Sequence, residues 1–407
     1  MLVHLSRAFW YYRFVRKSEP HAGSPAPSPG TPSKPIGLRD LAAYLGLSRT
    51  TVSLVLNNSP VAQALTPETR ERVLKAAAEL HYKANYFARM LNNKRSQMVG
   101  VLSPDFGEGY DSQILTAIER VLIDRNYLYF VSSHHWDKAL IQQRLQVFAE
   151  RGAEGMILIN THAPSGSALP MVSIGSWECD FPATRITVDN AYGIRQALEH
   201  LHALGHRKIA FLRGQALSSD AEARWIACKE AARELHLSIN KENVVQLKLI
   251  RDGLDPIREG YIACSQLLKA SRGFTALMAF NDLSAIGAIN ALRDAGRRIP
   301  EDVSVIGFDD IQAATIIHPA LTTIRQPLAR MGAMAASEIL ARIENPGMEP
   351  RNILLKPELV IRQSTVVCPQ GAFDDHERIS KTRSAPKARR AAGEVRAVRR
   401  PARAQVT

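Results

Sequence analysis

The apolar positions change their spacing once along the 407-residue chain. Within residues 38–57 they recur three and four positions apart, which is the spacing of one face of an α-helix. From Val99 onward, short continuous apolar runs alternate with longer stretches of helical spacing. Such runs are typical of parallel strands covered by helices on both faces. The pattern predicts a small helical region followed by a large α/β region.

Residues 38–57 predict two short helices joined by a tight turn. Gly46 tolerates the left-handed conformation that ends a helix, and Ser48 is placed to cap the second helix. The apolar faces comprise Leu41, Ala42 and Leu45 in the first helix and Val52, Val55 and Leu56 in the second. The outward face near the second helix's start carries Arg49, Thr50 and Ser53. This arrangement suits a helix in a DNA major groove, although an ordinary helical hairpin shares it.

A third helix is predicted to begin at Thr66-Pro67-Glu68. A capping hydroxyl, a proline at the first helical position and an acid near the positive end of the helix dipole favour a helix start. Three helices would form a DNA-binding domain over residues 37–83. Residues 84–97 follow as a hinge segment, too short to be a stable helix alone.

Residues 98–367 predict two lobes. The predicted strands are residues 99–102, 127–132, 156–159, 171–174, 208–212, 243–247, 276–280 and 303–308. The predicted helices are residues 111–126, 139–150, 191–204, 219–235, 255–269 and 282–295. The number of strands suits two doubly wound lobes rather than one. Because ligands collect at the carboxyl ends of parallel strands, we expect a binding cleft between the lobes.

The net charge of +13 is concentrated outside those two lobes. Residues 1–36, predicted to be a disordered extension and linker, carry +4, and residues 37–97 carry +5. Residues 368–407, predicted to be a basic disordered tail, carry +6, which leaves −2 on residues 98–367. This distribution indicates a nucleic-acid-binding head on a body that binds something else.

The cysteines and histidines predict neither disulfides nor a metal site. Four widely spaced cysteines without a CxxC pair are read as reduced thiols in a cytoplasmic protein. His134 and His135 are adjacent, so their side chains diverge on a strand. The sequence has no membrane-length apolar run and no clear signal peptide. We therefore expect a cytoplasmic protein without cofactor or membrane partner.

The ordered motifs resemble the LacI/GalR family of bacterial transcription regulators over residues 37–367. They include SRTTVSLVLN, ETRERV and ARML, then ITVDNAYGIRQALEHLHALGHRKIAFLRG, ALMAFNDLSAIGAINALRDAGRRIPEDVSVIGFDDI and HPALTTIRQPLARMG. The resemblance implies a three-helix helix-turn-helix head on a two-lobed body like that of periplasmic binding proteins. It also implies a repressor-like homodimer that binds palindromic double-stranded operator DNA and a small-molecule effector, with a sugar favoured.

For the head, the resemblance implies that Arg49 and Thr50 read bases. It assigns contacts with backbone phosphates or bases to Ser48, Thr51 and Ser53. Leu54 stands where other members carry a polar base-contacting residue, so it either touches a thymine methyl group or packs inside. In the hinge, Leu91 matches the leucine that wedges into the minor groove, with Ala88 and Arg89 beside it. An apolar wedge of that kind kinks DNA at a flexible step.

For the body, the resemblance implies four effector-binding residues: Asp105, Arg224, Asn281 and Asp309. The glycine that usually follows the arginine is replaced by Ala227. Asp282, beside Asn281, is expected to cap the following helix. Gly175 stands where some sugar-binding members carry an aspartate, which argues against a plain galactoside-like ligand. Trp177 and Glu178 nearby supply alternative stacking and hydrogen-bonding groups.

Two other classes of function were weighed against a DNA-binding regulator. A solute-binding protein shares the two-lobed body, but it would need a signal peptide and would lack the basic head. An enzyme is disfavoured because the sequence has no P-loop, no G-x-G-x-x-G after a strand, no nucleophile elbow and no HExxH. The sequence therefore favours an effector-controlled regulator that binds a specific DNA sequence.

Overall fold

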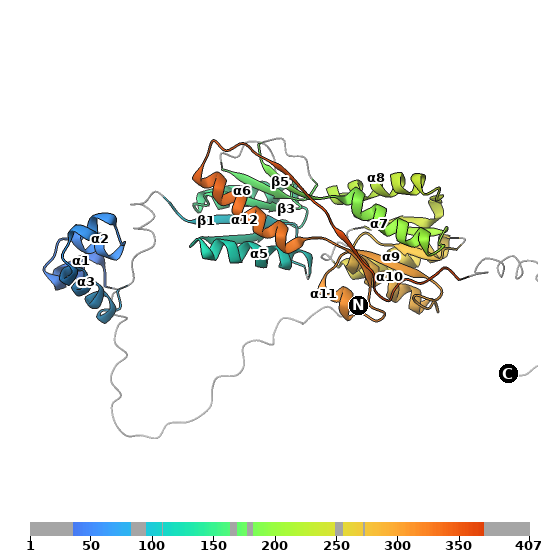
Figure 1. Ribbon diagram of the computed structural model, residues 1–407, viewed down its shortest axis with the longest axis horizontal. Helices are drawn as coiled ribbons and strands as arrows, with labels where there is room; N and C mark the ends of the chain where they lie inside the picture. Colours follow the sequence, from blue (N-terminus) through green and yellow to red (C-terminus); the bar gives the residue numbers. More distant parts are fainter. Residues whose placement is uncertain are drawn as a thin grey trace, which may run out of the picture. The chain divides into compact units, whose positions relative to one another are not determined.

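A computed structural model describes residues 36–82, 95–107, 109–162, 169–176, 182–248, 255–271 and 273–369. The chain divides into two compact units, Met1–Lys94 and Arg95–Thr407, and each is described by itself below. The first unit contains the helical head, and the second contains two sheets with their covering helices (Figure 1).

The head consists of α1 (Leu38–Leu45), α2 (Arg49–Leu56), the short 3-10 helix η1 (Pro60–Ala64) and α3 (Pro67–Glu79). Gly46 ends α1 in the left-handed conformation at φ +65°, which a side chain would strain. Ser48 caps α2 and Thr66 caps α3, each accepting the backbone N–H three residues on. The predicted helix ends are thus confirmed.

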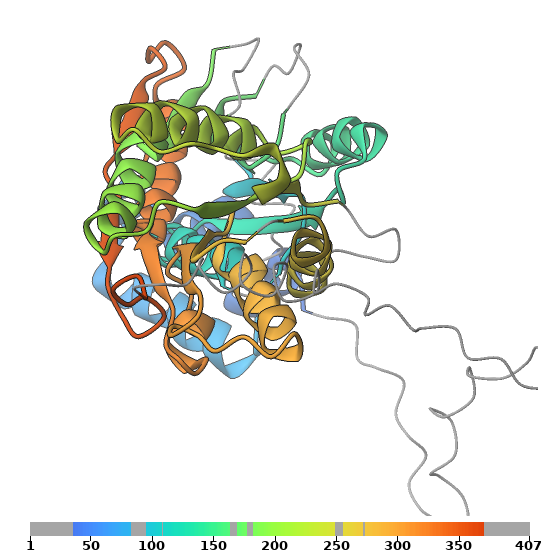
Figure 2. The ribbon, with the colours of Figure 1, turned by 90° about the vertical axis from the view of Figure 1, so that its right-hand side faces the viewer.

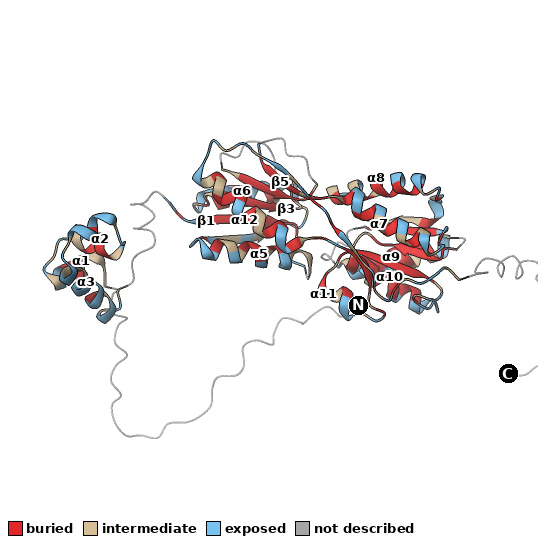
Figure 3. Cartoon of the chain, viewed as in Figure 1, coloured by how far each residue is buried: buried red, intermediate tan, exposed pale blue. Residues whose placement is uncertain are grey.

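The apolar faces of the three helices meet in one small core. Its buried members are Leu41, Ala42, Val52, Val55, Ala62, Val73 and Ala76. Leu54 and Leu56 are only partly buried and pack against that core. In Figure 3, the faces of the head helices that meet in the core are red, for buried residues, and the outward faces are pale blue, for exposed residues. This is the pattern that helical spacing of apolar residues predicts.

The first lobe is built on a six-stranded parallel sheet in the order β11-β5-β4-β3-β1-β2. Its strands are β1 (Met98–Ser103), β2 (Leu128–Ser133), β3 (Gly155–Ile159), β4 (Met171–Ile174), β5 (Thr184–Val188) and β11 (Asn352–Leu355). Its helices are α5 (Tyr110–Asp124), α6 (Lys138–Glu150) and α12 (Leu328–Glu344). The strands β1, β3 and β4 are almost wholly buried, which explains their continuous apolar sequence.

The second lobe is built on a six-stranded sheet in the order β12-β10-β9-β8-β6-β7. Its strands are β6 (Ile209–Arg213), β7 (Val244–Gln246), β8 (Ala276–Met278), β9 (Ser304–Asp309), β10 (Thr322–Arg325) and β12 (Glu358–Val360). Its main helices are α7 (Asn190–Ala203), α8 (Ser219–Glu234), α9 (Pro256–Ala270) and α10 (Asp282–Asp294), with the short η2 (Lys241–Asn243) and α11 (Gln312–Ile316). One side of the sheet packs against α7 and α8 and the other against α9 and α10 (Figure 2).

The chain passes between the lobes three times. It crosses after β5, returns after β10 to form α12 and β11, and crosses again to form β12. The first lobe is therefore completed by residues distant in sequence, since β11 pairs with β5. Interlobe crossings of this kind are the positions at which hinge motion between two lobes occurs in proteins.

The predicted elements up to residue 308 are confirmed, with ends displaced by a few residues. The structure adds β5, the short 3-10 helices η1 and η2 and, after β9, five further elements that the apolar pattern did not predict: α11, β10, α12, β11 and β12. The expectation of parallel sheets needs one correction. At the sheet edge, β12 pairs antiparallel with β10. The chain leaves the second lobe after β10 and enters it again along β12, so the two strands run in opposite directions.

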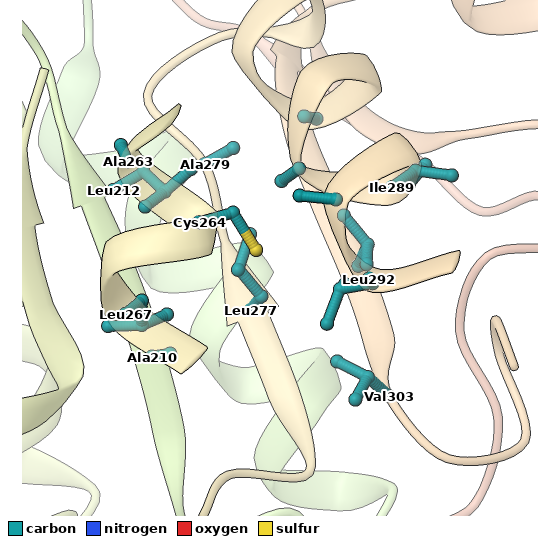
Figure 4. Packing of buried hydrophobic residues seen from close by; sticks show 14 of the residues in the cluster. Ala210, Leu212, Ala263, Cys264, Leu267, Leu277, Ala279, Ile289, Leu292 and Val303 are labelled. Carbon is teal, nitrogen blue, oxygen red and sulfur yellow. The ribbon is translucent and has the colours of Figure 1, made fainter. Parts of the chain in front are cut away.

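The core between α9, α10 and the second sheet is close-packed. Leu212, Cys264, Leu277, Ile289 and Leu292 interlock there, as Figure 4 shows. Two glycines, Gly260 and Gly287, allow the two helices to approach closely. A Cβ at Gly287 would lie 1.9 Å from the carbonyl oxygen of Ile257, and one at Gly260 would lie 2.3 Å from that of Ser284.

Gly287→Ala should therefore destabilise the second lobe although alanine favours helices. Forcing α9 and α10 apart costs roughly 1–3 kcal/mol, which exceeds the gain in helix propensity of about 1 kcal/mol. Denaturant unfolding monitored by circular dichroism measures this. Gly347→Ala is the control, because no atom lies within 4 Å of its added Cβ. Equal stability of the two variants would contradict the close approach.

Candidate ligand-binding site and nucleic-acid interface

A cavity of about 340 Å³ lies between the two lobes of the body, at the carboxyl ends of their strands. Polar, charged and aromatic side chains of both lobes line the cavity. They include Asp105, Tyr110, Asp111, Trp136 and Asn160 of the first lobe and Asp220, Arg224, Asp255, Phe280, Asn281 and Asp309 of the second. Its position agrees with the cleft expected from the strand pattern. The structure brings all four predicted effector residues into this one lining.

Arg224, on α8, is held in place on several sides. Its Nε donates to Asn190 Oδ1 at 3.0 Å, and its Nη1 donates to the carbonyl oxygen of Phe280 at 2.7 Å. Its Nη2 lies 3.7 Å from Asp309 Oδ1. The guanidinium also lies over the ring of Phe308, 3.7 Å from the centroid. The side chain is buried, so its orientation is fixed before any ligand arrives.

Asp309 ends β9 in an unusual backbone conformation. Its φ is +121°, which is rare for a residue with a side chain and recurs at functional sites. Gln326 Nε2 donates to its Oδ1 at 2.6 Å. Burial raises the pKa of the Asp309 carboxyl to about 6, against the opposing effects of Arg224 and Gln326. Asp309 therefore offers a poised hydrogen-bond acceptor to the cavity.

The cap of α10 is Asn281 rather than Asp282, which corrects the sequence expectation. Asn281 Oδ1 accepts the backbone N–H of Ser284 at 2.9 Å. Asp282 is the first helical residue, and its carboxyl accepts from the backbone N–H of Ile311 and from the Thr323 hydroxyl. Burial raises the pKa of Asp282 well above its ordinary value. Asn281 thus both caps the helix and lines the cavity, while Asp282 ties α10 to the neighbouring strands.

Several lining residues were not predicted from the sequence, and Asp111 and Tyr110 at the start of α5 are the clearest of them. Ser103 Oγ donates to Asp111 Oδ1 at 2.9 Å. Burial raises the pKa of Asp111 to about 7, helped by the nearby charges of Asp105 and Asp309 and opposed by the Ser103 hydrogen bond. Burial also raises the pKa of Tyr110. The signal was available, because both residues follow shortly after the carboxyl end of a predicted strand.

Asp111 should make stability depend on pH. Its raised pKa means that the folded state favours the protonated carboxyl. The resulting contribution to the free energy of unfolding is complete below about pH 3.8 and is lost as the pH rises to about 7. Relative to Asp111→Asn, the wild type should lose roughly 1.4 kcal/mol of unfolding free energy per pH unit between about pH 3.8 and pH 7, and nothing outside that window. Chemical denaturation at several pH values measures the difference. Asp124→Asn, at the exposed end of the same helix, is the control. A pH-independent difference would refute this account.

Ser176 joins the two lobes beside the cavity, where its hydroxyl also accepts from Asn190 Nδ2 on α7 at 3.3 Å. Ser176, just after β4 of the first lobe, donates its hydroxyl to Asp220 Oδ1 on α8 at 2.6 Å. Asn190 Nδ2 donates to the same oxygen at 3.2 Å. The start of α8 is thereby connected to the first lobe.

Ser176→Ala should loosen that connection. A hydrogen bond to a charged acceptor contributes on the order of 1.5 kcal/mol, so hydrogen exchange in the first turn of α8 should rise roughly fivefold to tenfold. Exchange followed by mass spectrometry measures it in the unliganded protein. Ser337→Ala, exposed on α12 of the first lobe, should change nothing there. Unchanged exchange in Ser176→Ala would show that the bond does not restrain the lobes.

Gly175 explains why no carboxylate occupies its position. Its φ is +121°, and an added Cβ would lie 2.5 Å from Asn160 Oδ1. Trp177 and Glu178 lie outside the described residues.

His134 is buried and pairs with the Thr161 hydroxyl, and burial lowers its pKa to about 4. Within the described ranges, no group of three or more histidine, cysteine, aspartate or glutamate residues could hold a metal ion.

In the head, the predicted base-reading residues lie on the surface at the start of α2. Arg49 and Thr50 are exposed. Ser48 and Thr51 share a hydrogen bond of 2.8 Å between their hydroxyls, and Ser53 Oγ accepts from Asn57. Arg49 and Thr50 are thus presented at the helix N-terminus, while the three hydroxyls are partly used by the fold. Ala88, Arg89 and Leu91 lie outside the described residues.

Within the described part of the chain, no helix is long and apolar enough to cross a membrane. Cys228, Cys264 and Cys368 are free, and burial raises the pKa of Cys228 and of Cys264 to about 12. These two thiols are therefore inert packing groups.

A two-lobed α/β body with a polar cavity between its lobes, preceded by a helix-turn-helix head, defines a class of ligand-binding DNA regulators. Residues 37–85 match the family description "bacterial regulatory proteins, lacI family", and residues 198–365 match "periplasmic binding protein-like domain". The HTH-type transcriptional repressor PurR of Haemophilus influenzae is 30% identical over 338 residues, which cover 80% of this chain and 98% of that protein.

Two solved structures extend the comparison. The lac repressor dimer bound to operator and the anti-inducer ONPF has 27% identity and a TM-score of 0.71, covering 82% of this chain and all of that one. A LacI-family regulator of Enterococcus faecium with bound ribose has 28% identity and a TM-score of 0.59, covering 67% of this chain and all of that one. The chain belongs to the LacI family. It is a transcriptional repressor with a periplasmic-binding-protein-like effector domain, not an enzyme.

Proposed function

We propose that this repressor binds a palindromic operator as a homodimer in the cytoplasm and that a sugar-like effector in the interlobe cavity controls its affinity for DNA. The observation that carries the proposal is the cavity itself. It joins both lobes and collects Asp105, Arg224, Asn281 and Asp309. A ligand that contacts both lobes must favour one of their relative orientations.

The residue types in the lining favour a polyhydroxylated ligand. Carboxylates and amide oxygens accept hydrogen bonds from hydroxyl groups, and Tyr110, Trp136 and Phe280 contribute aromatic rings to the lining. Pockets that bind small molecules combine a mostly apolar wall with a few such oriented polar groups. The ribose-bound relative from Enterococcus faecium supports a sugar as the ligand class.

For DNA recognition, we propose that α2 lies in the major groove and that Arg49 and Thr50 contact base edges. Ser48, Thr51 and Ser53 contact phosphates or bases near them. Their places at the exposed N-terminal part of the helix support this, because the N-terminal part of a recognition helix faces the bases. The lac repressor dimer on its operator supports two heads on a two-fold site.

We also propose a division of labour along the chain. Residues 37–83 form the DNA-binding domain and residues 98–367 the domain for effector binding and dimerisation. Residues 84–97 form a hinge, in which Leu91 enters the minor groove beside Ala88 and Arg89. Effector binding changes the lobe orientation, and the paired hinges transmit that change to the heads.

Operator selection in vitro tests the proposal. The full-length protein is incubated with randomised duplex DNA, and bound sequences are amplified and read. We expect a palindromic motif, and we expect a compound that binds the body to change the affinity for that motif. Enrichment of no motif, or of an asymmetric motif bound by one copy, would overturn the proposed DNA recognition.

A further inference from the structure

The interlobe cavity has an excess of negative groups. Five aspartates line it, named here the cavity carboxylates: Asp105, Asp111, Asp220, Asp255 and Asp309. Among the described lining residues, the single cationic side chain is Arg224. A sugar site with balanced charges would accept neutral and anionic ligands alike, whereas this lining discriminates between them by charge.

Most cavity carboxylates are held by neutral donors. Asp111 accepts from the Ser103 hydroxyl, and Asp220 accepts from Ser176 and Asn190. Asp255 accepts the backbone N–H of Arg258, and Asp105 that of Phe106. Neutral hydrogen bonds orient these groups without supplying a counter-charge, and the pKa of Asp111 is accordingly raised to about 7, mainly by burial. Of these four, Asp220 is buried, Asp105 and Asp111 are half-buried and Asp255 is exposed. A buried charge without a counter-ion is costly, so Asp220 in particular favours a ligand that supplies one.

Arg224 is already engaged within the protein. Its three nitrogens face Asn190, the Phe280 carbonyl and Asp309, and its plane lies over Phe308. Its positive charge is therefore offset by the carboxylate of Asp309, and little of it is available to attract an anionic ligand. A phosphate or carboxylate in the cavity would meet the other four aspartates without a free cation among the described residues.

Aromatic rings add to the negative electrostatic potential of the cavity. Tyr110 and Trp136 line the cavity on the first-lobe side. The face of an aromatic ring carries negative charge density and attracts a cation placed over it. Aromatic faces also stack against the apolar faces of sugar rings. The lining thus combines a stacking surface with an electronegative wall.

From this juxtaposition we infer that the effector is a polyhydroxylated amine, such as an amino sugar, bound in its ammonium form against the cavity carboxylates. The inference rests on the proposed function and narrows its ligand class. Ring hydroxyls donate to the carboxylates and to Asn281 Oδ1, and the ammonium group supplies the counter-charge that the lining lacks. Sugar phosphates and sugar acids are excluded by repulsion.

A charge-matched ligand panel tests the inference on the full-length protein. Thermal shift at pH 7.5 compares three amino sugars, glucosamine, galactosamine and mannosamine, with three matched ligands each. The matched ligands are the neutral parent sugar, the N-acetyl derivative and the 6-phosphate of the parent sugar. Within at least one matched set, the free amine should bind about tenfold more tightly than the parent or the N-acetyl derivative, since one added ion pair supports that ratio. The phosphate should not bind.

Isosteric variants then locate the charge. Asp111→Asn and Asp220→Asn each remove one negative charge with little change in shape. By calorimetry, each should weaken binding of the amine about tenfold more than it weakens binding of the parent sugar, because only the amine loses an ion pair. Asp124→Asn carries the same charge change on the exposed end of α5 and should bind as the wild type does. Thermal unfolding of each unliganded variant verifies that it is folded.

The outcomes separate the inference from the proposed function. A parent sugar or sugar phosphate that binds more tightly than its amine, or a panel in which no amine binds, would overturn the inference. Amine binding that is unchanged in both Asp111→Asn and Asp220→Asn would also overturn it. If a neutral sugar binds and alters operator affinity, the inference fails while the proposed function stands. Failure of operator selection would reject the proposed function and leave the ligand class unaffected.

Discussion

Asp309→Asn should weaken the response to effector roughly 10- to 100-fold while leaving operator binding intact. The asparagine keeps the shape of the side chain and can still accept from Gln326, which donates to Asp309 Oδ1 at 2.6 Å. It loses the charge that faces both Arg224 and the cavity. A charge-assisted hydrogen bond contributes roughly 1.5–3 kcal/mol, so effector affinity should fall on the order of 10- to 100-fold. Calorimetry with the effector and a gel-shift assay with the operator measure the two properties separately.

Asp302→Asn is the matched control for that experiment. It removes the same charge from the same lobe, at a surface position paired only with Arg298 in the described structure. Effector affinity should be unchanged. If Asp309→Asn binds effector as tightly as Asp302→Asn does, Asp309 is not a ligand, and the assignment of this cavity as the effector site loses its strongest residue.

Arg49→Ala should relax the sequence specificity of DNA binding. Arg49 is exposed at the first position of α2, where an arginine can form two hydrogen bonds to one guanine. Its loss should cost roughly 1–3 kcal/mol on the best operator and flatten one position of the selected motif in each half-site. Selection in vitro with both proteins shows the motif directly.

The control for Arg49→Ala is Arg39→Ala, which removes an equally exposed cation from α1. A cation that contacts only phosphates affects all sequences alike, so Arg39→Ala should lower affinity uniformly or not at all. An unchanged motif in Arg49→Ala would show that this residue does not read bases.

The sequence predicted most of the fold because its apolar spacing reflects local geometry. The caps at Ser48 and Thr66 and the left-handed Gly46 depend on a few neighbouring residues, and all three occur as expected. The buried strands β1, β3 and β4 read as continuous apolar runs for the same reason. Even the cap of α10 was misplaced by only one residue, because Asn281 and Asp282 are both good caps.

The C-terminal part of the body could not be read in this way. The β11 strand pairs with β5, 167 residues away at Arg185 and Asn352, and only that pairing completes the first lobe. Its exposed and intermediate positions give no buried apolar run to recognise. The antiparallel β12 is only three residues long, which is too short for a periodic signal.

The site was predictable where one position carries the signal and unpredictable where two distant segments meet. Arg224 and Asp309 stand out through their motifs, and the structure places them 3.7 Å apart. The pairing of Ser176 with Asp220 depends on how the two lobes meet, which no local pattern encodes. The excess of carboxylates also emerges only when residues from both lobes are counted around one cavity.

The central claim is that a ligand in the interlobe cavity controls operator affinity. Its most direct test is the operator dissociation constant of the full-length protein, with and without a saturating compound from the ligand panel, for wild type and Asp309→Asn. Allosteric coupling of this kind amounts to roughly a 5- to 150-fold change in affinity. We predict a change in that range for the wild type and a smaller change for Asp309→Asn at the same ligand concentration, with roughly 10- to 100-fold more ligand needed for an equal effect. Operator affinity that stays constant in the wild type while the cavity is saturated would contradict the claim.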